Sequence, residues 1–349
     1  MSWERNIRRV VPYTPGEQTN EKVIKINTNE CPYPPAPGVE KALKELNYES
    51  LRLYPKPAAD DLVNAIAKYY GKKSSQVFVG VGSDDVISMA FLAYFNSDKP
   101  VLFPDVTYSF YDVWADVYRI PYEKQALDDN FRIKPEDYYK ENGGIIFPNP
   151  NAPTGIYESL DMIEDIVKHN PDSVVIIDEA YIDFGGKSAL ALTDKYENLL
   201  VVQTFSKSRA MAGMRIGFAI GSEKLIKYLN DVKYSVNSYT MNTPSLVVGP
   251  IAIEDDAYFK ETTGKIIKTR EWMKNELKAL GFTFPDSMSN FIFATHKDYD
   301  AEELLKYLRE NKILVRHFKG ERVKDYLRIS VGTDEQAEAL MEALKKKIK

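Results

Sequence analysis

Two side chains with distinctive chemistry follow apolar runs of this sequence. Lys207, preceded by Ser206, comes shortly after the run at 199–204, and Asp178 ends the run at 173–178. A lysine at the end of a strand can form a Schiff base with an aldehyde when its surroundings lower its pKa. A carboxylate at the end of a buried strand is costly unless a cation pairs with it. A protonated ring nitrogen would be such a cation, although Asp178 could equally cap the next helix.

A further set of residues could hold a phosphate group. Gly82, Ser83 and Asp84 follow another apolar run and open a helical stretch. Glycine allows a close approach of the backbone, and the free amides of a first helical turn attract anions. Taken alone, this segment is also typical of an ordinary helix N-cap. Ser206 and Arg215 could complete the site, because a guanidinium can bind a dianion through two hydrogen bonds.

The order of the apolar runs indicates how these residues come together. From about residue 75 to 220, short runs rich in Val, Ile and Phe alternate with helical patterns. Several runs are continuously apolar, as expected of strands buried on both faces of a parallel sheet. The alternation predicts an α/β fold with a doubly wound, mostly parallel sheet, whose ligands bind beyond the carboxyl ends of the strands. The expected strands are 76–81, 100–104, 144–148, 173–178, 199–204 and 215–220, and the helical stretches between them include 84–94 and 160–169.

The rest of the chain has a different pattern. A long helical stretch at 257–280 precedes short apolar runs and further helices, which predicts a smaller α+β domain. A segment rich in Pro and Gly at 12–16 indicates an irregular arm. We therefore expect an N-terminal arm at 1–28, a large domain at 29–240 and a small domain at 241–349, which the arm completes. The expected strands of the small domain are 290–295, 313–316 and 326–331, and its later helices are 301–311 and one from about 334 onward.

Composition narrows the possible functions. The 349 residues carry a formal net charge of −5, which argues against nonspecific nucleic-acid binding. A single cysteine excludes a disulfide framework and a cysteine-ligated metal site, and the three histidines are too widely separated to form a metal motif. The charged N-terminus is unlike a signal peptide, and no run reaches the roughly 18 apolar residues of a membrane span. We expect a cytoplasmic protein without a metal, a nucleic-acid partner or a membrane association.

A set of short motifs carries a family resemblance. The motifs are Pro12-Tyr13 with Pro15-Gly16, Asn27-Thr-Asn-Glu30, Arg52-Leu-Tyr54-Pro55, Gly82-Ser-Asp-Asp85, Asn151-Ala-Pro-Thr-Gly155, Asp178-Glu-Ala-Tyr181, Ser206-Lys207, Ala212-Gly-Met-Arg-Ile-Gly217 and Leu327-Arg-Ile-Ser-Val-Gly-Thr333. In order and spacing they resemble the class I/II aminotransferases. Chance agreement of so many ordered motifs is remote. The likeness covers most of the chain, from Tyr13 to Thr333.

The resemblance implies the fold called type I and the cofactor pyridoxal 5'-phosphate. By this likeness, Lys207 carries the cofactor as a Schiff base and moves the proton during transamination. Asp178 pairs with the pyridine nitrogen, Tyr181 hydrogen-bonds the ring hydroxyl, and Tyr108 stacks on the ring.

The same likeness assigns the two anion sites. The cofactor phosphate would be bound by Ser83, Asp84, Ser206 and Arg215, with Tyr54 reaching in from a second subunit. This last role implies a homodimer with shared active sites. The substrate anion would be bound by Arg328, with Arg316 and Tyr13 near it.

One position departs from the family pattern. Members commonly have Asn-Asn-Pro-Thr-Gly, and the asparagine next to the proline contacts the ring hydroxyl of the cofactor. Ala152 occupies that position in this chain. Either Asn151 takes over the contact as a cofactor-binding residue, or Tyr181 acts with less help.

The motifs are most similar to those of family members that act on L-histidinol phosphate. The implied reaction converts L-histidinol phosphate and 2-oxoglutarate into imidazole-acetol phosphate and L-glutamate, in histidine biosynthesis. The substrate amine carries a phosphate and no carboxylate, whereas glutamate carries two carboxylates. A pair of arginines can bind either anion, because the guanidinium geometry suits both.

Three other functions remain open. A threonine-phosphate decarboxylase shares this architecture, although such enzymes typically have His-Gly-Gly-Asn in the arm, where this chain has the segment at 12–16. An aromatic amino-acid aminotransferase would use the same catalytic residues. A transcription regulator built on the fold would need a basic DNA-binding extension, for which the arm is too short and not basic enough.

Overall fold

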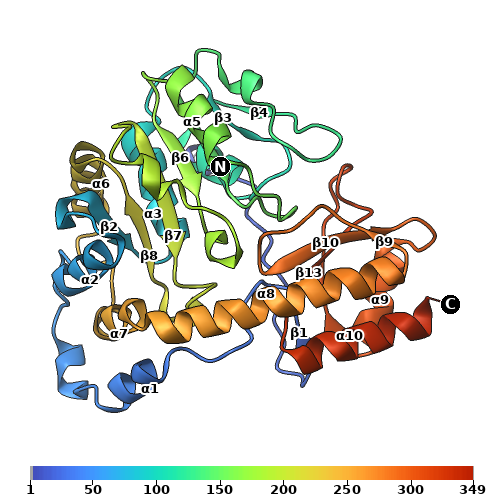
Figure 1. Ribbon diagram of the computed structural model, residues 1–349. Helices are drawn as coiled ribbons and strands as arrows, with labels where there is room; N and C mark the ends of the chain where they lie inside the picture. Colours follow the sequence, from blue (N-terminus) through green and yellow to red (C-terminus); the bar gives the residue numbers. More distant parts are fainter. Residues whose placement is uncertain (1–2, 349) are drawn as a thin grey trace.

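The computed structural model describes residues 3–348, and its largest element is a seven-stranded sheet (Figure 1). The strand order is β2-β8-β7-β6-β5-β3-β4, and only β8 runs antiparallel to its neighbours. The predicted α/β fold with a mostly parallel sheet is therefore confirmed. The strands are β2 (Val77–Gly80), β3 (Val101–Pro104), β4 (Tyr122–Gln125), β5 (Gly144–Pro148), β6 (Val175–Asp178), β7 (Leu199–Thr204) and β8 (Gly217–Ile220).

Helices cover both faces of this sheet, as a doubly wound fold requires. Because side chains alternate along a strand, neighbouring residues of β6 and β7 belong to two different cores. Ile177 and Val201 pack in one core, and Ile176 and Val202 pack in the other. The first core is covered by α1 (Pro37–Lys44), α2 (Asp60–Tyr70), α5 (Leu160–His169) and α7 (Thr243–Glu254), and the second by α3 (Ser83–Tyr94), α4 (Tyr111–Tyr118) and α6 (Glu223–Val236).

A smaller antiparallel sheet forms the second domain. Its strand order is β12-β13-β10-β9, and strand β1 of the arm pairs in parallel with β11 beside it. This pairing explains how residues of the arm join the small domain. The strands are β1 (Ile24–Lys25), β9 (Phe282–Thr283), β10 (Phe291–His296), β11 (Ile313–Leu314), β12 (Arg316–His317) and β13 (Leu327–Ser330), and the helices are α9 (Ala301–Glu310) and α10 (Asp334–Lys347).

The long helix α8 (Asp256–Ala279) runs beneath both domains (Figure 1). Val248 and Ala252 of the preceding helix α7 belong to the core of the large domain. Ile266 and Met273 of α8 belong to the core of the small domain. The change of core therefore takes place along α8, and the domain boundary after residue 240 stays a prediction.

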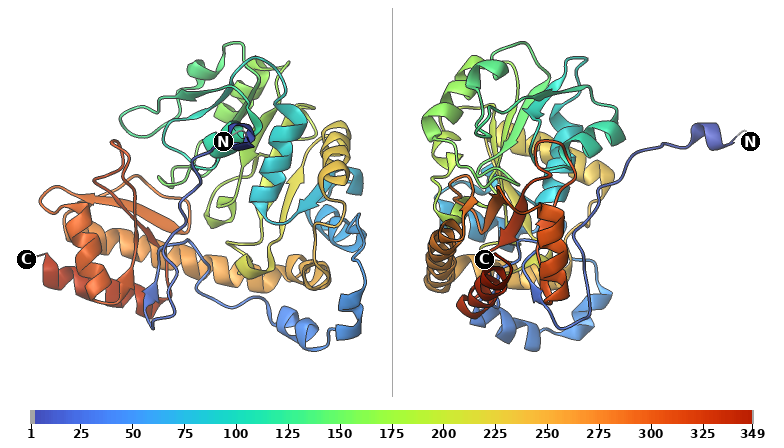
Figure 2. Two further views of the ribbon diagram at one scale, coloured as in Figure 1. Left: turned by 180° about the vertical axis from the view of Figure 1, so that it is seen from behind. Right: turned by 90° about the vertical axis from the view of Figure 1, so that its right-hand side faces the viewer.

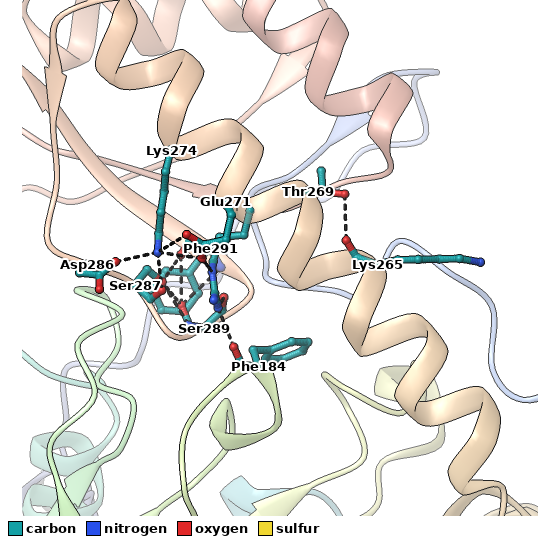
Figure 3. Close-up of polar contacts among 10 residues, drawn as sticks. Phe184, Lys265, Thr269, Glu271, Lys274, Asp286, Ser287, Ser289 and Phe291 are labelled. Carbon is teal, nitrogen blue, oxygen red and sulfur yellow. Dashed lines mark hydrogen bonds and ion pairs between the residues drawn. The ribbon is translucent and has the colours of Figure 1, made fainter.

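Two buried cationic side chains of α8, Arg270 and Lys274, bind segments around the boundary between the two domains. Arg270 Nη1 donates to the carbonyl of Phe184 in the large domain at 2.7 Å and to that of Ser289 at 2.9 Å. One turn later, Lys274 Nζ contacts Asp286 at 2.7 Å and the carbonyl of Ser287 at 3.0 Å (Figure 3). These contacts fix the loop after Tyr181 relative to the segment that leads into β10.

The N-terminal arm lies along the outside of the molecule. Figure 2 shows its first described residues projecting away from both domains. Val11 and Trp3 of this segment are exposed. Among residues 3–348, no helix is both long and apolar enough to cross a membrane.

Candidate active site

A cavity of about 290 Å³ lies at the carboxyl ends of the parallel strands, where the small domain faces the large one. The loops after β2, β3, β5, β6 and β7 all reach this edge, and antiparallel β8 begins there. Eleven of the thirteen predicted site residues line it. They are Tyr13, Ser83, Asp84, Tyr108, Asp178, Tyr181, Ser206, Lys207, Arg215, Arg316 and Arg328.

Lys207 is placed for attack on a group bound in the cavity. It follows β7, and its Nζ donates to the carbonyl of Thr28 at 3.5 Å. The same Nζ lies 5.7 Å from the centre of the Tyr181 ring. Within residues 3–348, Lys207 forms no ion pair. Its amine is therefore not held by an acid, as a nucleophilic lysine requires.

Asp178 is a buried carboxylate without a cationic partner among the described residues. Its side chain accepts hydrogen bonds from Tyr111 Oη at 2.9 Å and from the amide of Ala180 at 3.2 Å. Burial raises its pKa to about 6, because neither neighbour carries a positive charge. A protonated ring nitrogen fits this site well, since it would supply the missing cation.

Two glycines allow close packing where Arg215, the start of α3 and β8 meet. A Cβ on Gly82 would lie 2.5 Å from Arg215 Nη2, and one on Gly217 would lie 2.3 Å from the amide nitrogen of Ser83. Arg215 itself has a φ of 54°, and its Nη1 lies 3.5 Å from Ser206 Oγ. The N-terminal amides of α3, the Ser206 hydroxyl and the guanidinium therefore meet at one point, which suits a dianionic phosphate.

A methyl group at position 217 should disturb this cradle. In a Gly217→Ala variant the Cβ would lie 2.2 Å from the carbonyl carbon of Gly82, so the start of α3 would have to move. Overpacking of this kind costs about 1–3 kcal/mol, and we expect cofactor affinity to fall about tenfold or more. Equilibrium titration of the cofactor-free protein with pyridoxal phosphate would measure the loss. Gly213→Ala is the matched control, because its Cβ would meet no atom within 4 Å. Equal affinities for the two variants would contradict this account of the cradle.

Aromatic rings form one wall of the cavity. Tyr108 Oη donates to Asp84 Oδ1 at 2.8 Å, and burial, followed by the charge of Asp84, raises the pKa of this phenol. Tyr13 of the arm stacks on Phe110, with 4.3 Å between ring centres, and lies 6.4 Å from the ring of Tyr108. The wall therefore offers flat apolar surface for a cofactor ring and a substrate ring.

Two arginines of the small domain face each other at the other end of the cavity. Arg316 of β12 and Arg328 of β13 are direct cross-strand partners. Arg316 donates to the carbonyls of Thr14 and Pro15, and Arg328 donates to that of Asn27. Within the described chain neither arginine pairs with an acid, and the buried Nε of Arg328 has no hydrogen-bond partner. Directly opposed like charges are unfavourable, so this pair is suited to an anion that bridges them.

The two remaining predicted residues do not line the cavity. The side-chain amide of Asn151 donates to the Val106 carbonyl at 3.0 Å and accepts from Thr107 Oγ1 at 3.2 Å, so it is committed to the loop after β3. The side chain of Tyr54 is 81% exposed and lies against Tyr239.

The segment at 27–30 also lines the cavity, although sequence reasoning gave it no role. Asn29 Nδ2 donates to Tyr181 Oη at 3.0 Å. The only sequence signal was the motif Asn27-Thr-Asn-Glu30, which contributed to the resemblance but carried no assigned chemistry. Among residues 3–348, no group of three or more His, Cys, Asp or Glu side chains could hold a metal ion.

An unpaired lysine, a buried carboxylate and a phosphate cradle at one edge of a mostly parallel sheet define the class of this protein. It is a pyridoxal-phosphate-dependent enzyme of fold type I. The sequence model of the family described as "Aminotransferase class I and II" matches residues 21–344. The chain belongs to this family, and the resemblance inferred from the sequence motifs is confirmed.

Comparisons with individual proteins agree with this assignment. The chain is 48% identical over 350 residues to the histidinol-phosphate aminotransferase of Lactococcus lactis, covering 100% of this chain and 98% of that protein. It is 50% identical over 344 residues to the histidinol-phosphate aminotransferase of Brachyspira hyodysenteriae, covering 98% and 97%. The crystal structure of histidinol-phosphate aminotransferase from Sinorhizobium meliloti in complex with pyridoxal-5'-phosphate has a similar fold, with a TM-score of 0.85 at 22% identity and coverage of 94% and 91%.

Proposed function

We propose that this enzyme transfers an amino group between L-histidinol phosphate and 2-oxoglutarate, giving imidazole-acetol phosphate and L-glutamate. Relatives that are 48–50% identical along almost their whole length carry the name of that activity. The observation that carries the proposal is the opposed pair of Arg316 and Arg328, which has no acidic partner within residues 3–348. A substrate that presents a phosphate or a carboxylate at this point would compensate the two charges.

Each cavity residue then has a definable task. When bound, pyridoxal phosphate supplies an electron sink for the carbon that loses its proton. Lys207 Nζ would hold the cofactor aldehyde and afterwards carry the proton between two carbon atoms. Asp178 would keep the ring nitrogen protonated, and Tyr181 would donate its hydroxyl proton to the ring oxygen. Arg215, the Ser206 hydroxyl and the first amides of α3 would bind the phosphate.

The anion pair explains how one site can serve both half-reactions. Histidinol phosphate would present its phosphate to the pair in one half-reaction, and 2-oxoglutarate would present a carboxylate in the other. Arg328 Nε is buried and unpartnered, so a donor is available in addition to the group that contacts Asn27. Burial lowers the pKa of Arg328, and the charge of Arg316 lowers it further. An anion bound between the two arginines would favour the charged form of both.

Removing Arg328 should impair both half-reactions. For Arg328→Ala we expect kcat/KM to fall about 100-fold with L-histidinol phosphate and with 2-oxoglutarate alike, because truncating one member of a buried charged contact costs about 2–5 kcal/mol. Steady-state assays with each substrate varied would measure both values. Arg132→Ala is a suitable control, since that guanidinium lies outside the cavity and contacts Glu158. A loss confined to one substrate would contradict a shared anion site.

Substrate choice tests the proposal as a whole. We expect kcat/KM for L-histidinol phosphate to exceed that for histidinol or phenylalanine by about 100-fold or more. Histidinol offers the arginine pair no anion, and the single charge of the phenylalanine carboxylate compensates the pair less fully than a phosphate dianion does. A preference for phenylalanine would instead identify an aromatic amino-acid aminotransferase.

We also propose that the enzyme works as a homodimer. Large hydrophobic side chains are exposed along the segment at 48–54, and such exposure is typical of protein interfaces. Tyr54, at the end of this segment, is not among the described residues that line the cavity of its own subunit, and it would contribute to the phosphate site of a partner. Sedimentation velocity should give the mass of a dimer. A monomer with full cofactor affinity would contradict the proposal.

A further inference from the structure

The hydroxyl of Tyr181 borders the cavity and has one polar partner in the described chain. That partner is Asn29, whose Nδ2 donates to Tyr181 Oη at 3.0 Å. Among residues 3–348, no acceptor is found for the hydroxyl proton of Tyr181. A phenol that accepts a hydrogen bond from an amide keeps its own proton for another acceptor. In this position the proton is directed into the cavity.

The orientation of the Asn29 amide is set by its surroundings. Ser330 Oγ donates to Asn29 Oδ1 at 2.9 Å and accepts the backbone N–H of Asn29 at 2.9 Å. The Asn29 carbonyl in turn accepts from Asn290 Nδ2 at 2.9 Å. Because Ser330 donates to the oxygen of the amide, the amide nitrogen faces Tyr181.

The backbone at Asn29 also suits this task. Its φ is 55°, a left-handed conformation that asparagine tolerates better than most residues. Asn29, Ser330 and Asn290 are all at least 98% buried, so the network is protected from water. Such a network holds its donor in place before any ligand binds.

Neither residue of the usual asparagine motif can supply this donor. Ala152 lies in the cavity wall and has no polar side-chain atom. The amide of Asn151 is occupied by Val106 and Thr154. In the described chain, Asn29 is therefore the side-chain amide that supports Tyr181, and it comes from a segment 152 residues away.

We infer that Asn29 is a positioning residue for Tyr181 and compensates for the asparagine that is absent at Ala152. By donating to Oη, the amide strengthens the hydrogen bond that Tyr181 donates to the ring oxygen of the cofactor, because consecutive hydrogen bonds polarise one another. Ser330 supports the arrangement by orienting Asn29. This inference rests on the proposed cofactor. It means that the junction between the arm and the small domain helps to set the strength of the hydrogen bond to the cofactor.

The test is a pH titration of the visible absorbance of the cofactor-loaded enzyme. Weaker hydrogen bonding would leave more negative charge on the ring oxygen of the cofactor. This charge would favour protonation of the nearby Lys207 nitrogen, through which the cofactor would be attached. For Asn29→Ala we therefore expect the titration midpoint to rise by about one pH unit, a tenfold higher proton affinity. Asn29→Asp should move it further in the same direction, because a carboxylate would accept the Tyr181 proton. In the double variant Asn29→Ala/Ala152→Asn, the midpoint should return toward that of the unmodified enzyme.

A matched control separates positioning from a loss of stability. Asn142 is another buried asparagine, bonded to Asn170 away from the cavity, and Asn142→Ala should lower thermal stability without moving the midpoint. An unshifted midpoint in Asn29→Ala, or a shift in Asn142→Ala of equal size, would overturn the inference alone. Absence of any titrating absorbance in the unmodified enzyme would instead overturn the proposed function.

Discussion

Replacing Lys207 with alanine should reduce transamination by about 10⁴-fold or more and remove the visible absorbance of the lysine-bound cofactor. In the proposed function the amine is both the attachment point and the proton carrier, and acid–base assistance alone contributes about 10²–10⁴-fold. Within residues 3–348, no other lysine lines the cavity, so no neighbouring amine can replace it. Absorbance spectra and single-turnover kinetics of the purified variant would measure both effects.

Lys207→Arg is the informative companion to this variant. It keeps a positive charge near Thr28 and Tyr181 but cannot form a Schiff base under ordinary conditions. We expect it to be as inactive as Lys207→Ala while binding the cofactor phosphate and ring. Substantial turnover by either variant would show that Lys207 is not the catalytic amine.

Replacing Asp178 with asparagine should lower kcat by about 10²–10³-fold, because a fixed charge that stabilises the developing electron distribution is lost. The neutral amide keeps the size of the carboxylate and can still accept from Tyr111 Oη, so the fold should be retained. Rapid-mixing measurement of the amino-transfer step would determine the loss. An unchanged rate would mean that Asp178 does not hold the ring nitrogen in its protonated form.

In the cofactor-free protein, the same substitution should have a favourable effect on the free energy of unfolding. The folded-state pKa of Asp178, about 6, lies above its ordinary value of 3.8, so folding favours the protonated form. Stability from this residue is present below pH 4 and is lost as the pH rises through about 6. Without cofactor, Asp178→Asn should therefore be the more stable protein at pH 8, by an amount on the order of 3 kcal/mol, and nearly equal at pH 4.

Denaturant unfolding of both cofactor-free proteins across this pH range would test the prediction. Burial also raises the pKa of neighbouring Glu179, to about 7, but that residue is present in both proteins and cancels from the comparison. When the cofactor is bound, its ring cation should remove the advantage of the asparagine. A stability difference that does not change with pH would contradict an uncompensated carboxylate at this site.

The parts of the site that follow strand ends were predictable from the sequence. Asp178 ends one apolar run, Lys207 and Ser83 come shortly after two others, and parallel strands bring their carboxyl ends to one edge. Strand β4 was not predicted, because strands were recognised by their apolar runs and β4 has none. Its sequence Tyr122-Glu-Lys-Gln125 contains two charged residues, because it lies at the exposed edge of the sheet and needs no apolar run.

Other features depend on contacts between distant segments and left no readable pattern. The direction of the Asn151 side chain is set by Val106 and Thr107, and no local rule connects them. Asn29 meets Tyr181 and Ser330 because the arm is held beside the small domain, through β11 and through the bond from the Ser330 amide to the Ile26 carbonyl. The opposed arginines likewise depend on the register of two short strands. The sequence does not mark the place where the chain passes from one hydrophobic core to the other, because one continuous helix, α8, serves both cores.

A single half-reaction tests the central claim most directly. The yellow enzyme would be mixed with L-histidinol phosphate in the absence of any keto acid, and O-phosphothreonine would be tested in parallel. We predict that the visible absorbance disappears at a rate set by amino transfer and that one equivalent of imidazole-acetol phosphate is released per active site. Release of carbon dioxide from O-phosphothreonine, with L-histidinol phosphate inert, would contradict the account and identify a decarboxylase on the same fold.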